Sequence, residues 1–307
     1  MNLTYTNPII DRYLADPCLV WDEGEQAYFL FATGPTREDG RAIPVYRSPD
    51  LVHWTFVRGA VARGATKDAW NFTHFWAPEV IRIGDTYHLY YTASPEDSPK
   101  NSGNRVGLAV SKSIAGPYED AGVVVPHGSI DGHPFIDDDG GFFLFYTIEH
   151  LNADGLVAGQ IYMDRMLDPR TVARDPKPVI THHEWQEGPW LLKRGGRYFL
   201  AYSCGGWTGA DYHVRWAVGD SPSGPFTEQE SRILESTDAV KGPGHHSMFQ
   251  DRKGRDWICY HGWDPAFTAR YPRIDRIYFE EGRMRSDGPT SSPQPVHRQR
   301  IWSGTHA

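Results

Sequence analysis

The sequence lacks the features that mark several common classes of protein. Its three cysteines, Cys18, Cys204 and Cys259, are odd in number and widely spaced, so neither a disulfide framework nor a Cys-x-x-Cys metal site is expected. No apolar run approaches the roughly 18 residues of a membrane span. The first residues do not combine a basic segment with an apolar one, as a signal peptide does. We therefore expect a cytoplasmic protein that does not bind membranes.

Positive charge is also scarce, because 31 Lys and Arg face 39 Asp and Glu, for a net charge of −8 at pH 7. Neutralising phosphates requires a basic face, so this balance argues against nucleic-acid binding. Aromatic residues, by contrast, make up 13% of the 307 residues, alongside 31 Gly and 23 Pro. Strands favour aromatic side chains and tight turns favour Gly and Pro, so the composition predicts many short strands joined by turns.

Helical periodicity is nearly absent, whereas one pattern of short segments recurs along the whole chain. In each copy a turn with Gly or Asp, typical of a hairpin, precedes a strand rich in aromatic residues, and further strands follow. The aromatic strands recur every 55 to 60 residues, at positions 28–31, 87–91, 142–146, 198–202 and 257–261.

Two hairpins per repeat make a four-stranded antiparallel sheet, and five such sheets arranged radially form a five-bladed β-propeller. We therefore expect an all-β chain forming one domain over residues 1–307. A β-sandwich or two stacked β domains is the alternative, but the repeat persists through the whole chain and favours the propeller. The expected blades span roughly residues 10–60, 70–122, 128–178, 184–230 and 240–290.

The first strand of each blade lines the channel of a propeller, so polar residues at these strand starts should meet at one end of the axis. Three of the five expected strand starts carry a carboxylate: Asp16, Asp131 and Glu187. Each also has a simpler explanation, since Asp16 and Asp131 could be turn residues and Glu184 competes with Glu187 in the same loop. Carboxylates gathered in one pocket repel one another and raise at least one pKa, an arrangement that suits glycoside hydrolysis.

Five short motifs, in order and at blade spacing, resemble glycoside hydrolase family 43 over residues 7 to about 284. The resemblance implies a five-bladed β-propeller that hydrolyses mainly arabinofuranosides and xylosides with inversion. It implies that Asp16 is the general base, Glu187 the general acid, and Asp131 the residue that tunes the pKa of the acid and orients it. The motifs are Ala15-Asp16-Pro17, Phe75-Trp76-Ala77-Pro78, Ser129-Ile130-Asp131-Gly132-His133, Glu187-Gly188-Pro189-Trp190 and Gly242-Pro243-Gly244-His245.

The same resemblance implies further contacts with the sugar. Trp76 stands in the tryptophan position that packs against the apolar face of the bound sugar. Arg273 resembles the arginine that reaches the acid and the substrate, with Arg276 as its rival on the same segment. Weaker candidates for the wall of the pocket are Phe75, Trp70, Trp207 and Trp263.

His245 resembles the histidine that lies beside a calcium or sodium ion in the axis of many family members, directly or through water. Calcium prefers six to eight oxygen ligands, so waters and backbone carbonyls would have to complete its shell. The alternative is a buried histidine whose hydrogen bonds the backbone satisfies. No organic cofactor is expected.

These features favour an inverting, exo-acting α-L-arabinofuranosidase whose substrates are short oligosaccharides of the plant-cell-wall type. A β-D-xylosidase, an endo-arabinanase and a galactofuranosidase are alternatives within the same family. A non-catalytic sugar-binding propeller is the alternative of another class, but such a protein would not need all three carboxylates. The sequence predicts no particular oligomeric state.

Overall fold

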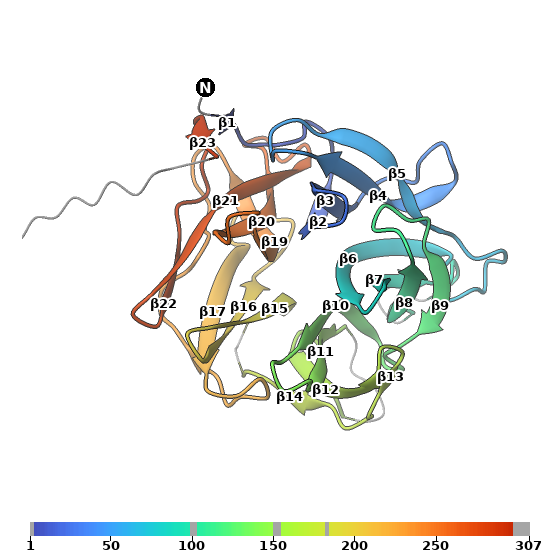
Figure 1. Ribbon diagram of the computed structural model, residues 1–307. Helices are drawn as coiled ribbons and strands as arrows, with labels where there is room; N and C mark the ends of the chain where they lie inside the picture. Colours follow the sequence, from blue (N-terminus) through green and yellow to red (C-terminus); the bar gives the residue numbers. More distant parts are fainter. Residues whose placement is uncertain (1–2, 99–102, 150–154, 182–183, 297–307) are drawn as a thin grey trace, which may run out of the picture.

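The computed structural model describes residues 3–98, 103–149, 155–181 and 184–296, where every regular element is a β-strand. Five antiparallel sheets stand around a common axis (Figure 1), which confirms the predicted five-bladed β-propeller. No helix long and apolar enough to span a membrane occurs among these residues.

Each blade follows chain order, with its first strand at the axis. Blade one comprises β2 (Ala15–Asp22), β3 (Ala27–Thr33), β4 (Arg41–Ser48) and β5 (Thr55–Ala62). Blade two comprises β6 (Thr73–Ile83), β7 (Thr86–Ser94), β8 (Arg105–Ser111) and β9 (Glu119–Val123). Blade four comprises β15 (Gln186–Arg194), β16 (Arg197–Cys204), β17 (His213–Gly219) and β18 (Thr227–Glu228). Blade five comprises β19 (Lys241–Gln250), β20 (Asp256–Trp263), β21 (Arg270–Glu280) and β22 (Arg283–Ser286).

Blade three departs from the predicted four strands. Its inner strands are β10 (Ser129–Ile136), β11 (Phe142–Ile148) and β12 (Ile161–Asp168). Two short strands, β13 (Thr171–Val172) and β14 (Lys177–Pro178), both pair with β12, so the outer edge of this sheet is divided.

The recurrent aromatic segments are the second strands of the blades, and their side chains fill the spaces between neighbouring sheets. Tyr90 and Tyr146, for example, belong to one buried cluster that joins blades two and three. Tyr28 and Trp257 belong to a cluster that joins blades one and five and so closes the ring. Full burial of one such side chain stabilises the fold by about 2–3 kcal/mol. Near the ends of the described chain, β1 (Thr4–Tyr5) pairs with β23 (Gln294–Pro295).

The first strand of every blade contains a β-bulge at the same place. Its register shifts there, and the shifted residue has a positive φ angle, a conformation that non-glycine residues rarely adopt. Such strain persists where the surrounding structure enforces it, often at functional sites. The five bulge residues are Asp16 (φ 49°), Ala77 (φ 46°), Asp131 (φ 62°), Gly188 (φ 55°) and His245 (φ 43°).

In four blades the N–H of the bulge residue donates to a side chain from the second strand of the preceding blade. These bonds position the bulge residues by linking neighbouring sheets near the axis. The pairs are Asp16 with His261 Nδ1 at 3.1 Å, Ala77 with Thr33 Oγ1 at 2.9 Å, Asp131 with Thr92 Oγ1 at 3.1 Å, and His245 with Ser203 Oγ at 2.8 Å.

Candidate active site

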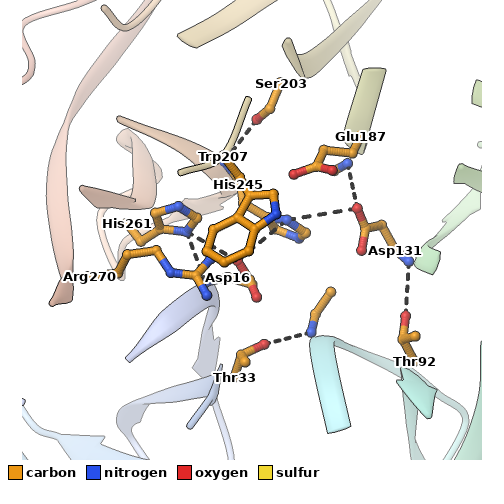
Figure 2. A network of polar contacts seen from close by, with 12 residues as sticks. Asp16, Thr33, Thr92, Asp131, Glu187, Ser203, Trp207, His245, His261 and Arg270 are labelled. Carbon is orange, nitrogen blue, oxygen red and sulfur yellow. Dashed lines mark hydrogen bonds and ion pairs between the residues drawn. The ribbon is translucent and has the colours of Figure 1, made fainter. Parts of the chain in front are cut away.

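Four ionisable side chains, each from a different blade, meet at the bulged end of the axis (Figure 2). Asp16 comes from β2, Asp131 from β10, Glu187 from β15 and His245 from β19, and each is exposed by 8% or less. The chain fold therefore brings together the three carboxylates that the sequence singled out, although they are far apart in the sequence.

Asp16 is surrounded by basic groups. Its Oδ1 lies 3.4 Å from Nη1 of Arg270, 3.1 Å from Nδ1 of His261 and 3.5 Å from Nδ1 of His245. Burial alone would raise the pKa of Asp16, but His245 and Arg270 lower that pKa well below its usual range. Burial lowers the pKa of His261 to about 4, so this imidazole is neutral and its Nδ1 accepts the Asp16 N–H. Asp16 is therefore ionised at neutral pH, as a general base must be.

The pKa of Asp131 is shifted in the opposite direction. Burial, together with the charges of Glu187 and Asp16, raises the pKa of Asp131 to about 8, although His245 opposes this change. The carboxyl therefore carries a proton at neutral pH. Its Oδ2 also accepts the N–H of Gly188 at 2.9 Å, which is the residue directly after Glu187.

Two donors hold the Glu187 carboxylate. Nε1 of Trp185 donates to Oε2 at 2.7 Å, and the Tyr212 hydroxyl donates to Oε1 at 2.6 Å. Neither donor lies within the five sequence motifs. Tyr212 is 25 residues from Glu187 along the chain, so only the pairing of strands within blade four brings the two together.

His245 lies between Asp16 and the Asp131 side of the site, as Figure 2 shows. Its Nδ1 is 3.5 Å from Oδ1 of Asp16 and 3.8 Å from Oδ2 of Asp131. Burial opposes protonation, but the surrounding carboxylates, Asp16 first among them, raise the pKa of His245 above its usual value. Protonation of this imidazole reduces the repulsion between the carboxylates.

The arginine beside the carboxylates is Arg270, which corrects the prediction of Arg273. The two residues are three apart on β21, and an odd separation places side chains on opposite faces of a strand. Arg270 reaches Asp16, whereas the buried Arg273 contacts none of the three carboxylates among the described residues. The rival Arg276 lies elsewhere, with its guanidinium 4.9 Å from the ring centroid of Trp257.

Trp207 forms part of the wall around the carboxylates. Its ring centroid lies 4.5 Å from Cζ of Arg270, and its indole stacks on Trp263 with centroids 6.3 Å apart. Trp207 is nevertheless 45% exposed. An exposed aromatic face above a buried arginine is suited to contact a sugar ring.

Trp76 and Phe75 line a cleft of about 450 Å³ between blades one and two. Trp76 stacks on His74 with centroids 4.5 Å apart and keeps part of its surface exposed. Phe75 is only 7% exposed, and most of its ring belongs to the core between the blades. Tyr13 lines the same cleft and accepts a hydrogen bond from Arg270 at 2.7 Å, which connects the cleft to the carboxylates.

A cation could be held by Asp131, Glu187 and His245, whose ligand atoms lie within 4.8 Å of one another. The set supplies two carboxylate oxygens and one nitrogen, fewer than the six to eight oxygens that calcium prefers. Water would have to complete the shell, and ligation by His245 would require loss of its proton. These residues therefore fit calcium or sodium only in part.

Comparisons with known proteins agree with this geometry. The family described as "Glycosyl hydrolases family 43" matches residues 5–284. The beta-D-galactofuranosidase xynD of Aspergillus niger is 30% identical over 303 residues, covering 90% of this chain and 82% of the relative. A probable arabinan endo-1,5-alpha-L-arabinosidase A of Aspergillus flavus is 26% identical, covering 86% of this chain and 85% of the relative.

Among solved structures, a thermostable family-43 glycoside hydrolase superimposes with a TM-score of 0.84 and 31% identity, covering 96% of this chain and 100% of that one. The match therefore extends over the whole propeller, including every strand that carries a carboxylate of the site. The chain belongs to family 43 of the glycoside hydrolases, as its five sequence motifs predict.

Proposed function

We propose that this hydrolase acts with inversion and releases single pentofuranose residues, as an exo-acting α-L-arabinofuranosidase. One observation carries the proposal: two buried carboxyls of one site differ in charge at neutral pH. Asp16 is ionised, whereas Asp131, beside Glu187, holds a proton. A glycosidase needs a base and a proton donor together in one pocket.

On the base side, Asp16 accepts a proton from water while the water oxygen forms a bond to the anomeric carbon. Arg270 keeps Asp16 ionised and orients its carboxylate through the contact with Oδ1. Nδ1 of His245 lies 3.5 Å from Oδ1 of Asp16 and 3.8 Å from Oδ2 of Asp131 and so links the base to the acid side of the site. An inverting mechanism requires about 6.5–9.5 Å between base and acid, so that a water molecule fits beside the sugar.

On the acid side, Glu187 donates a proton to the glycosidic oxygen as the bond to the anomeric carbon breaks. The proton that Asp131 holds near neutral pH is transferred to Glu187 and from there to the leaving oxygen, since the carboxyl oxygens of the two residues lie within 4.8 Å of each other. The bond from Gly188 N–H to Asp131 fixes the backbone next to Glu187, while Trp185 and Tyr212 fix its carboxyl group. Asp131 thus positions the acid and supports its protonation.

The proposal of a furanoside substrate is supported by the chemistry shared by two relatives. One is named a beta-D-galactofuranosidase and the other an endo-1,5-alpha-L-arabinosidase. β-D-Galactofuranose and α-L-arabinofuranose have the same ring configuration and differ by one hydroxymethyl group. A pocket for this ring, between Trp76 and Trp207, would accept either sugar depending on the space around its exocyclic carbon. A cytoplasmic location, as proposed from the sequence, would limit the substrates to short oligosaccharides.

A panel of nitrophenyl glycosides tests the proposal. We expect the α-L-arabinofuranoside to give the highest kcat/KM and Asp16→Asn to lower turnover by about 10²–10⁴-fold, while the exposed Asp238→Asn control keeps full activity. Asn tolerates the positive φ of position 16, so the variant should fold. A higher rate on the galactofuranoside or xyloside would replace the proposed specificity, and no turnover on any member would refute the proposed reaction.

Two further measurements test the course of the reaction. An inverting enzyme first releases the anomer opposite to that of its substrate, which ¹H NMR detects before the product equilibrates. An exo-acting enzyme releases only arabinose from linear arabino-oligosaccharides, whereas an endo-acting enzyme releases shorter oligosaccharides first. Retention of configuration would contradict the role of Asp16 as a base.

The calcium or sodium ion beside His245 is also a proposal. We expect elemental analysis of the purified protein to find one such ion per chain, and His245→Gln to lose it. Metal content unchanged by this substitution would place the ion elsewhere.

A further inference from the structure

A second group of metal-ligating side chains lies in blade four, outside the carboxylate site. Glu184, Cys204 and His213 each offer one ligand atom, and these atoms all lie within 4.8 Å of one another. From this geometry we propose a binding site for a divalent transition metal, with Zn²⁺ as the ion that fits best.

The strand pairing of blade four fixes two of the three ligands. Cys204, at the end of β16, lies directly opposite His213, at the start of β17. Directly opposed residues of antiparallel strands have Cβ atoms about 4.5–5.5 Å apart, so the thiol and the imidazole reach a common point. Both are buried, with exposures of 0% and 2%. The site is therefore built on rigid elements.

The imidazole of His213 is oriented as a ligand. Its Nδ1 lies 2.7 Å from the carbonyl oxygen of Asp211, to which it donates, so Nε2 carries the lone pair in the neutral ring. This Nε2 is buried and has no hydrogen-bond partner among the described residues. A carbonyl that fixes the tautomer of a histidine is the usual companion of a metal-bound imidazole.

The third ligand can close the site with a small movement. Oε2 of Glu184 lies 4.0 Å from Nε2 of His213, and the Glu184 side chain is 50% exposed. Tetrahedral Zn²⁺ has bonds of about 2.0–2.1 Å to such atoms, which places the two ligand atoms about 3.4 Å apart. For this pair of atoms the difference is only about 0.6 Å, and solvent supplies the fourth ligand from the open side.

The chemical nature of the three ligand atoms determines which metal ion fits the site. One thiolate, one imidazole and one carboxylate suit Zn²⁺, whereas calcium and magnesium prefer oxygen ligands alone. The position is also informative, because Trp185 follows Glu184 and Tyr212 precedes His213. An ion here would tie together the two segments whose side chains hold Glu187.

Titration of the metal-free protein with Co²⁺, followed by displacement with Zn²⁺, tests the site. A cobalt–thiolate bond gives a charge-transfer band in the near ultraviolet that carboxylate ligands do not give. We expect this band at one ion per chain, its loss in Cys204→Ser, and a Zn²⁺ affinity at least about tenfold weaker in Glu184→Gln. The controls are Cys259→Ser, another buried cysteine, and the exposed Glu230→Gln, which should bind as the unaltered chain does.

Three results would overturn the proposal: no charge-transfer band, a band that persists in Cys204→Ser, or a Zn²⁺ affinity that Glu184→Gln leaves unchanged. The first result, together with tight Zn²⁺ binding, would point to the carboxylates near His245 as the binding site. Glu184 is exposed, so its variant remains informative even where a change at the buried Cys204 prevents folding. A rise in Tm on adding Zn²⁺, present in the unaltered chain and absent in the variants, provides a readout independent of the absorbance.

Discussion

Replacing Asp131 by Asn should stabilise the fold while it impairs catalysis. Burial and neighbouring charges raise the pKa of Asp131 from 3.8 to about 8. A carboxyl whose pKa is raised in the folded state destabilises that state as the pH rises from about 4 to about 8, because the unfolded chain releases its proton earlier. Asn has nearly the same shape, tolerates the positive φ at this position, and can still accept the N–H of Gly188.

The size of the effect follows from the pKa. At about 1.4 kcal/mol per pH unit, the roughly three units between 3.8 and pH 7 give a gain of about 4 kcal/mol in the free energy of unfolding. The gain should be near zero at pH 4 and reach its full size near pH 8. Urea unfolding of the variant and the unaltered chain at pH 4, 5.5, 7 and 8 measures it.

Asp238→Asn is the matched control, because it makes the same replacement at an exposed position. A stability difference for Asp131→Asn that does not grow between pH 4 and pH 8 would show that Asp131 is not held protonated. The contrast in charge that supports the proposed mechanism would then be lost.

Three further predictions concern the reaction itself. Glu187→Gln should slow hydrolysis of natural glycosides far more than that of nitrophenyl glycosides, whose leaving groups need little protonation; equal losses would exclude Glu187 as the acid. Arg270→Gln should move the acidic limb of the kcat/KM profile to higher pH, because the guanidinium lowers the pKa of Asp16, whereas Arg273→Gln should leave that limb in place. Trp207→Ala should raise KM several-fold with little change in Tm, since the ring is 45% exposed; an unchanged KM would remove it from the sugar site.

The fold could be predicted because its core follows a local pattern. Each aromatic second strand pairs with the strands directly before and after it in the chain, so one repeat of the sequence forms one blade. The division at the outer edge of blade three could not be predicted in this way. Strands of two residues, such as β13 and β14, are too short to show the alternation of apolar and polar residues by which a strand is recognised in a sequence.

The carboxylates could be predicted because they stand at equivalent points of the repeat. The groups that set their charges could not, because these come from strands that bear no motif. Arg270 and Arg273 lie on opposite faces of β21, and this strand is largely buried on both faces, so its sequence lacks the alternation that would tell the faces apart. Tyr212 reaches Glu187 across two strands, so its role depends on tertiary packing alone.

One hydrogen bond distinguishes the blade that carries Glu187 from the other four. On the second strand of the preceding blade, the side chain equivalent to Thr33 and Thr92 is Thr147, whose buried hydroxyl has no partner among the described residues. The N–H of Gly188 binds Asp131 instead. An unpaired buried hydroxyl costs about 1–3 kcal/mol. In return, the carboxyl of Asp131, which unlike a hydroxyl can gain and lose a proton near neutral pH, contacts the backbone next to Glu187, so one blade of a five-fold scaffold carries a distinct acid.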